Sequence, residues 1–194
     1  MSRAAASSRS APLRPIRVLG RRRWRVFSRD AQANRLFLWG LAIAGVVLIA
    51  DQASKYWVLE VLDLDQPAPY GRSIEVLPFF NLSMVWNRGV SFGLLAGDGA
   101  RYLLSLFSLL VAAGLIVWLA SIRRPLLTVG VAGVIGGAVG NLIDRLTHGA
   151  VVDFLDFSGL YFPWVFNVAD AGISCGVGLI LLENLLRGAE PQSQ

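Results

Sequence analysis

Four stretches of the sequence are long and apolar enough to cross a lipid bilayer, and they limit the fold more than any other feature. They lie at about residues 36–57, 102–122, 126–143 and 168–186, and a membrane-spanning helix needs about 20 mostly apolar residues. Each must be helical, because the bilayer interior offers the backbone amides no water to bond. The composition agrees, since 55% of the residues are hydrophobic and 16% are charged, against about 45–50% and about 25% in soluble domains. We therefore predict an all-α membrane protein with four transmembrane helices.

Basic residues gather at one end of the predicted spans. Ten arginines lie within residues 1–35, Arg123 and Arg124 separate the second span from the third, and Arg187 follows the fourth. In a chain with four spans these places lie on one side of the membrane, which the positive-inside rule makes the cytoplasmic side. We therefore expect both termini in the cytoplasm, with residues 1–35 as a disordered tail and residues 188–194 as a second short tail.

Two loops are expected on the extracytoplasmic side, at about residues 58–101 and 144–167. Within the first loop, Ser73–Pro78 and Phe79–Val85 are rich in β-forming residues and are flanked by Gly, Pro and Asp. This pattern is typical of short strands. We therefore predict a small extracytoplasmic β-rich subdomain on a four-span domain of residues 36–187.

The scarcity of cysteine and histidine argues against several kinds of site. Cys175 alone cannot form a disulfide framework or a cysteine metal cluster, and His148 alone cannot form a site of several histidines. A Cys–His nucleophile pair is not expected either, because Cys175 lies inside the last span. The basic excess belongs to a tail, so we expect no nucleic-acid partner. We predict neither a metal nor a cofactor.

Glycines recur four residues apart in the third and fourth spans. The pairs are Gly133 with Gly137, Gly136 with Gly140, and Gly172 with Gly176. Small residues at this spacing allow helix backbones to approach closely. We expect the third and fourth spans to pack against each other.

Polar and ionisable residues gather at the predicted extracytoplasmic ends of the spans. Such residues are costly inside a membrane and usually have a function there. They form five clusters, at residues 51–55, 87–93, 140–145, 151–157 and 166–170.

Three of these clusters have simple structural explanations. Asp51 and Lys55 share a helix face, and we favour a structural ion pair over direct catalysis, with binding of a substrate head group as the alternative. Asn141 and Asp144 also share a face and could merely end the third span in polar residues. Gly89 suggests a backbone angle that other residues rarely adopt, and an ordinary turn would explain it.

The last two clusters contain the aspartates with the clearest chemical interpretation. Asp153 stands among Val, Val, Phe and Leu, so we expect desolvation to raise its pKa. Asp156 fits an exposed loop acid better. Asn167 can cap the fourth span, with Asp170 at the capping-box position. Two neighbouring carboxylates can share a proton and polarise a water molecule.

In their order and spacing, the five clusters resemble the lipoprotein signal peptidases (signal peptidase II). The matching motifs are Asp-Gln-x-Ser-Lys at 51–55, Asn-x-Gly-x-x-Phe at 87–92, Gly-Asn-x-x-Asp-Arg at 140–145, Val-Val-Asp-Phe at 151–154 and Phe-Asn-x-Ala-Asp at 166–170. The resemblance covers about residues 36–187. It departs at Ser54, where the family usually has Thr, and at Val90-Ser91, where Ala-Ala is common.

The resemblance implies a metal-free aspartyl peptidase of the bacterial inner membrane. It would cut diacylglyceryl-modified prolipoproteins on the N-terminal side of the lipid-bearing cysteine, with Asp153 and Asp170 as the catalytic pair. Asp144 is the main rival for a catalytic place. Supporting or substrate-binding roles fall to Asp51, Lys55, Asn87, Gly89, Asn141, Asp144, Arg145, Asn167 and Ala169. We expect a monomer whose partners are its prolipoprotein substrate and membrane lipid.

Three other functions remain open from the residues alone. Intramembrane carboxylates also mark the ion paths of proton- or cation-coupled transporters, although here they lie at one face and no inverted repeat is evident. A non-enzymatic scaffold would predict effects of mutation on stability only. A peptidase that binds Mg²⁺ or Mn²⁺ through its carboxylates would lose activity in chelator.

Overall fold

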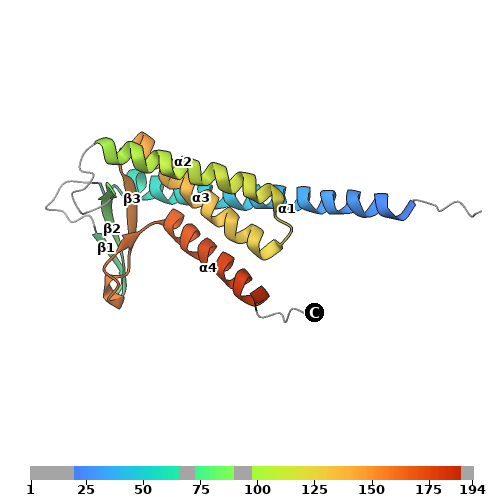
Figure 1. Ribbon diagram of the computed structural model, residues 1–194. Coiled ribbons are helices and arrows are strands. Elements are labelled where there is room, and N and C mark those ends of the chain that lie inside the picture. Colours follow the sequence, from blue (N-terminus) through green and yellow to red (C-terminus); the bar gives the residue numbers. More distant parts are fainter. Residues whose placement is uncertain (1–19, 66–72, 90–97, 189–194) are drawn as a thin grey trace, which may run out of the picture.

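The computed structural model describes residues 20–65, 73–89 and 98–188 (Figure 1). Its long helices are α1 (Gly20–Tyr56), α2 (Asp98–Ser121), α3 (Pro125–Thr147) and α4 (Val168–Gly188). Within the described residues, four helical segments are long and apolar enough to cross a membrane, at residues 31–61, 101–121, 125–147 and 168–187. The prediction of four membrane-spanning helices is therefore confirmed.

Two helices extend further than the sequence suggested. α1 begins at Gly20, so the second half of the tail predicted to be disordered is helical, while residues 1–19 lie outside the described residues. Arginine favours helix, and adding residues to an existing helix avoids the cost of nucleation. α1 also continues through a π-helical turn, η1 (Trp57–Val61). α3 reaches Thr147, which places Asp144 and Arg145 in its last turn rather than in a loop.

A small antiparallel sheet lies at one end of the helix bundle (Figure 1). Its strands are β1 (Ser73–Leu77), β2 (Phe80–Asn87), β3 (Val151–Asp156) and β4 (Val165–Phe166), in the order β1-β2-β3-β4. The first two occur where strands were predicted. β3 and β4 were not predicted, and they bring the second loop into the same sheet as the first. The β2–β3 register pairs Val85 with Asp153 and Asn87 with Val151.

α3 is the central helix of the bundle. In its most apolar stretch 72% of the residues are buried, against 17% or less in the other three spans. The glycine face of α3 allows this burial, because a side chain at Gly133 would meet the backbone of Gly172, and one at Gly136 would meet the backbone of Ala44. α1 and α4 therefore both pack closely on α3, as the glycine spacing predicted for α4.

The close contact between α3 and α4 predicts a large effect for Gly137→Ala. A Cβ at Gly137 would meet the Ala169 carbonyl and lie 2.7 Å from Cγ1 of Ile173. We expect the change to destabilise the protein by about 1–3 kcal/mol, since overpacking forces backbone shifts. Thermal unfolding in detergent measures this effect.

Gly178→Ala on α4 is the matched control, because nothing lies within 4 Å of the added Cβ. It should be neutral or stabilising by up to about 1 kcal/mol, the difference in helix propensity. Equal destabilisation by both substitutions would contradict the packing argument.

Candidate active site

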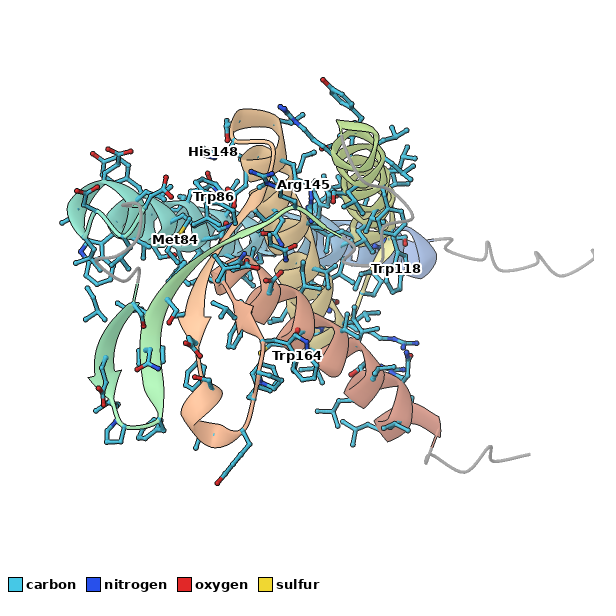
Figure 2. All side chains as sticks on the ribbon, turned by 90° about the vertical axis from the view of Figure 1, so that its left-hand side faces the viewer. Met84, Trp86, Trp118, Arg145, His148 and Trp164 are labelled. Atoms are coloured by element: carbon cyan, nitrogen blue, oxygen red, sulfur yellow. The ribbon has the colours of Figure 1, made fainter. Side chains whose placement is uncertain are left out.

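The described residues of the five polar clusters come together where the sheet meets the bundle. The buried polar residues of these clusters are Asp51, Lys55, Asn141, Asp144, Asp153 and Asn167. They come from α1, α3, β3 and the start of α4. Figure 2 shows Arg145 close to this junction, near Trp86 and His148, whose ring centroids are 5.5 Å apart.

Lys55 lies between two buried carboxylates. Its Nζ is 2.8 Å from Oδ2 of Asp51 and 2.7 Å from Oδ2 of Asp144, and all three side chains are at most 4% exposed. Nζ also donates to Oδ1 of Asn141 at 3.2 Å. The ammonium thus occupies the space between the carboxylates in which a metal cation could otherwise lie. Within the described residues, no three His, Cys, Asp or Glu side chains are grouped as metal ligands would be.

The same two carboxylates also hold backbone groups of other elements. Oδ1 of Asp51 accepts a hydrogen bond from the Ala169 amide at 2.8 Å, in the first turn of α4. Oδ2 of Asp144 accepts from the Val152 amide of β3 at 3.1 Å. The ion pair therefore fixes α4 and β3 against α1 and α3. This geometry supports the structural interpretation of Asp51 and Lys55.

Gln52 is a site residue to which sequence reasoning gave no role. Its Nε2 donates to Oδ1 of Asp144 at 3.0 Å and to Oδ2 of Asp51 at 3.1 Å, and it lies 3.3 Å from the Gly140 carbonyl. Gln52 belongs to the first polar cluster, at residues 51–55, and its place in that cluster is the sequence feature that could have indicated a role in the site. A side chain at Gly140 would collide with the Asp51 carboxylate, so only glycine fits there.

Asn167 and Asp170 form the capping arrangement that their spacing predicted. The Asp170 amide donates to Oδ1 of Asn167 at 2.9 Å, and the Asn167 amide is 3.4 Å from Oδ2 of Asp170. Oδ1 of Asp170 accepts a second hydrogen bond, from Nδ2 of Asn141 at 2.8 Å. The half-buried Asp170 carboxylate is therefore held at the N-terminus of α4 by two asparagines.

Asp153 is only 2% exposed and is held by two amide groups. Nδ2 of Asn167 donates to its Oδ1 at 2.7 Å, and Nδ2 of Asn87 donates to its Oδ2 at 3.0 Å. Burial raises the pKa of Asp153 to about 6; the hydrogen bond from Asn87 opposes this shift and the negative charge of Asp170 adds to it. Because Asn167 contacts both acids, it links Asp153 to Asp170.

The remaining predicted residues lie around this pair. Nη1 of Arg145 donates to the Asn141 carbonyl at 3.2 Å. Gly89 has a φ of +94°, the unusual backbone angle expected of it. Its amide donates to Oδ1 of Asn87 at 2.9 Å, which leaves Nδ2 of Asn87 facing Asp153. Residues 90–93 of this motif, including Val90-Ser91, lie outside the described residues.

A cavity of about 340 Å³ opens between α2, α3 and α4 beside Asp170. Its walls are mostly apolar, with Leu104 and Phe107 from α2, Ala138 from α3 and Ile173 from α4. Asn141, Arg145 and Asp170 form its polar part. The cavity could hold an apolar chain with a polar group next to Asp170.

This fold and this site define a multi-pass membrane protein with a cluster of buried carboxylates beside an apolar cavity. The family model of signal peptidase (SPase) II matches residues 43–186. The chain is 53% identical to the lipoprotein signal peptidase of Caulobacter vibrioides over 147 residues, which cover 75% of this chain and 85% of that protein. It is 44% identical to the lipoprotein signal peptidase of Shewanella loihica over 155 residues, which cover 77% of this chain and 87% of that protein.

A solved structure described as a bacterial membrane enzyme is also similar. It superposes with a TM-score of 0.68 at 28% identity, covering 80% of this chain and 92% of that one. The chain belongs to the signal peptidase II family. It is therefore a membrane protease of the type that processes prolipoproteins, and the resemblance seen in the sequence is confirmed.

Proposed function

We propose that the protein is an aspartic endopeptidase that removes signal peptides from diacylglyceryl-modified prolipoproteins on the N-terminal side of the lipidated cysteine. The proposed catalytic pair is Asp153 and Asp170. The main support for this pair is that Asn167 contacts both carboxylates: its Nδ2 donates to Oδ1 of Asp153 at 2.7 Å, and its backbone amide lies 3.4 Å from Oδ2 of Asp170. The family of the chain supports the choice of substrate.

The proposed chemistry is general acid–base hydrolysis. Asp153, whose pKa is raised, starts protonated and donates a hydrogen bond to the scissile carbonyl. Asp170 starts ionised and takes a proton from a water molecule, whose oxygen adds to the carbonyl carbon. The tetrahedral intermediate then collapses, the C–N bond breaks, and the leaving amine receives the proton held by Asp170. No covalent bond to the protein is formed.

Asp51, Lys55 and Asp144 have a supporting role in this mechanism. Lys55 forms ion pairs with both carboxylates, and these also accept hydrogen bonds from the Ala169 and Val152 amides. They would hold the elements that carry Asp153 and Asp170 at a fixed separation. The short bonds that Lys55 makes to Asp144 argue against a catalytic role for Asp144.

The apolar cavity suggests how substrate would reach the pair. Leu104, Phe107 and Ile173 suit an apolar part of the lipid-anchored peptide, and the chain would run from there past Asp170. Arg145 borders the same cavity and could bind a carbonyl or ester oxygen of the substrate. Asn87 and Gly89 would act by orienting Asp153.

The proposed location is the bacterial inner membrane, with both termini in the cytoplasm and the site near the extracytoplasmic face. The support is charge: Arg123, Arg124 and Arg187 lie at the end of the spans away from the sheet. The protein would act as a monomer without metal or cofactor, on prolipoprotein and within membrane lipid, with no nucleic-acid partner.

The direct test is cleavage of a purified prolipoprotein, with and without its diacylglyceryl group, in the presence of chelator. We expect cleavage of the lipidated form, with the product's new N-terminus at the modified cysteine. Equal cleavage of the unmodified form would contradict the substrate assignment. Loss of cleavage in chelator would contradict the metal-free mechanism. No cleavage by a folded protein, together with ion flux in proteoliposomes, would favour the transporter.

The raised pKa of Asp153 predicts the pH dependence of cleavage. The reaction needs Asp153 protonated, so kcat/KM should fall above a pKa of about 6, by about tenfold per pH unit. In Asn87→Ala the hydrogen bond that favours the ionised form is lost, so the pKa rises and the decline should move to higher pH. A pH profile of kcat/KM measures both.

Asn81→Ala is the control for this shift. Asn81 is on the same strand as Asn87 but pairs with Asp156 rather than Asp153. Its pH profile should match that of the unmodified protein. If Asn81→Ala and Asn87→Ala shifted the pH at which kcat/KM declines by the same amount, Asp153 would not be the group whose titration causes the decline.

A further inference from the structure

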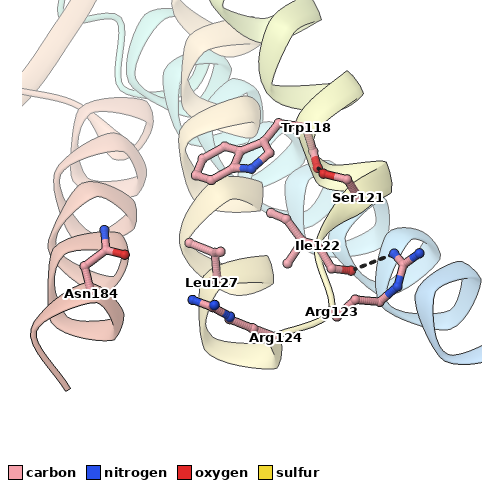
Figure 3. Close-up of a pocket in the computed structure, with 7 residues that line it drawn as sticks. All are labelled: Trp118, Ser121, Ile122, Arg123, Arg124, Leu127 and Asn184. Atoms are coloured by element: carbon pink, nitrogen blue, oxygen red, sulfur yellow. Dashed lines mark hydrogen bonds between the residues drawn. The ribbon is translucent and has the colours of Figure 1, made fainter. Parts of the chain in front are cut away.

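A second cavity, whose lining Figure 3 shows, lies at the opposite end of the bundle from Asp153 and Asp170. Its volume is about 420 Å³, and it is lined by the end of α2, the turn that follows, the start of α3 and Asn184 of α4. Along α3, Pro125 at this end is about 28 Å from Asp144, at 1.5 Å per residue. The volume is within the range of about 300–1,000 Å³ usual for ligand sites. The cavity is separate from the site described above.

Among the described residues, Arg124 is the cation of this cavity that lacks a close partner. The nearest carboxylate in the described part of the chain is Glu183, at 3.9 Å from Nη1. The same Glu183 oxygen is bound by Nε of Arg187 at only 2.9 Å, so the acid is already paired. Within the part of the chain that the structure describes, the Arg124 guanidinium makes no hydrogen bond. Two arginines therefore share one carboxylate, which leaves one positive charge at the cavity.

Arg123 adds a second positive charge, but it is turned differently. Its Nη1 lies 3.2 Å from the Ala120 carbonyl and 3.4 Å from that of Ile122. In Figure 3 Arg124 and Asn184 lie on the α3–α4 side, whereas Arg123 extends away from them. The donors available to a ligand between α3 and α4 are thus Arg124 and the Asn184 amide.

The rest of the lining is apolar and belongs at a membrane boundary. Trp118, which is 42% exposed, stands beside the buried Ile122 and Leu127. Tryptophan is enriched at the level of lipid headgroups. α2, α3 and α4 all reach their ends here, so the cavity lies where the apolar spans meet the interface. A ligand with one anionic group and apolar chains fits these surroundings.

We propose that this cavity binds the headgroup of an anionic phospholipid, with the phosphodiester on Arg124, the glycerol near Asn184 and the acyl chains along Trp118. Basic pockets between transmembrane helices bind anionic headgroups in this way. A free phosphate ion would gain nothing from the apolar part of the lining. The site therefore selects a lipid rather than a soluble anion.

The test is native mass spectrometry of the full-length protein in neutral detergent, titrated with phosphatidylglycerol. We expect a saturable first site that phosphatidylcholine does not fill and that excess inorganic phosphate does not empty. Arg124→Gln should weaken binding about tenfold, the usual effect of losing a charged hydrogen bond. Asn184→Leu keeps every charge and should weaken binding by a smaller factor.

Arg35→Gln is the matched control. Arg35 is an exposed arginine on α1 near the same end of the bundle and does not line the cavity. Its loss should leave the affinity unchanged. Equal weakening by Arg35→Gln and Arg124→Gln, unchanged binding in Arg124→Gln, or displacement by inorganic phosphate would each overturn the proposal. Thermal unfolding in lipid-free detergent shows whether each variant is folded. If Arg124→Gln does not fold, the affinity of Asn184→Leu for phosphatidylglycerol tests the proposal, and an unchanged affinity would overturn it.

Discussion

Replacing either Asp153 or Asp170 with asparagine should lower the rate of cleavage by about a thousandfold or more, the upper part of the range for a lost general acid or base. Asparagine has nearly the same shape but cannot exchange a proton with water or with the leaving amine. Both carboxylates accept hydrogen bonds from amides, Asp153 from Asn87 and Asn167 and Asp170 from Asn141. The one oxygen that asparagine keeps can still accept one of these bonds, so we expect the substituted side chain to remain in the site. Single-turnover cleavage of a diacylglyceryl prolipoprotein measures the loss.

Two further asparagine variants make this prediction specific. Asp156 is on the same strand as Asp153, but its carboxylate binds Ser83 at 2.6 Å and the Ser158 amide at 2.9 Å, so Asp156→Asn should cleave normally. Asp144→Asn should lower stability more than it lowers the rate of the folded fraction. If Asp144→Asn lost as much rate as Asp153→Asn at unchanged stability, Asp144 rather than Asp153 would be assigned to the catalytic pair.

Lys55→Met should destabilise the fold by about 3–5 kcal/mol, the usual effect of removing one partner from a buried ion pair. The substitution leaves Asp51 and Asp144 facing each other with side chains at most 2% exposed and no cation between them. Because Asp51 also binds the Ala169 amide, the loss should loosen the start of α4. Unfolding of the purified protein in detergent, followed by circular dichroism, measures the change.

A double-mutant cycle with Asp144→Asn tests the cause. In that background one of the two unpaired carboxylates is already neutral, so Lys55→Met should destabilise the protein less than it does alone. Additive effects would mean that Lys55 contributes through packing of its alkyl chain rather than through charge.

The sequence alone was sufficient for the four spans, because each depends on a local run of apolar residues. It was also sufficient for the capping of α4 by Asn167, since the capping residues are three positions apart. Strand β3 was not predicted, because its partner β2 is distant in the sequence. The Val-Val-Asp-Phe run was interpreted only as the apolar surroundings of Asp153. Which strands pair over such a distance cannot be inferred from neighbouring residues.

The links between clusters could not be predicted for the same reason. The Asp51 carboxylate meets the Ala169 amide across 118 positions, and Gln52 meets Asp144 across 92. The sequence placed these residues at the same end of the bundle, but only the packing of α1 and α4 on the glycines of α3 brings them into contact. The clash that excludes a side chain at Gly140 likewise depends on the tertiary structure.

The position of Asp170 at the start of the last helix has a consequence for biosynthesis. A chain that has been translated only as far as β3 already contains Asp153, but it lacks Asn167 and the second carboxylate. Proteolytic activity of the proposed kind can therefore appear only after the final helix has entered the membrane and packed on α3. A nascent or truncated chain would be unable to cut its neighbours, so the order of synthesis would itself delay the onset of proteolysis.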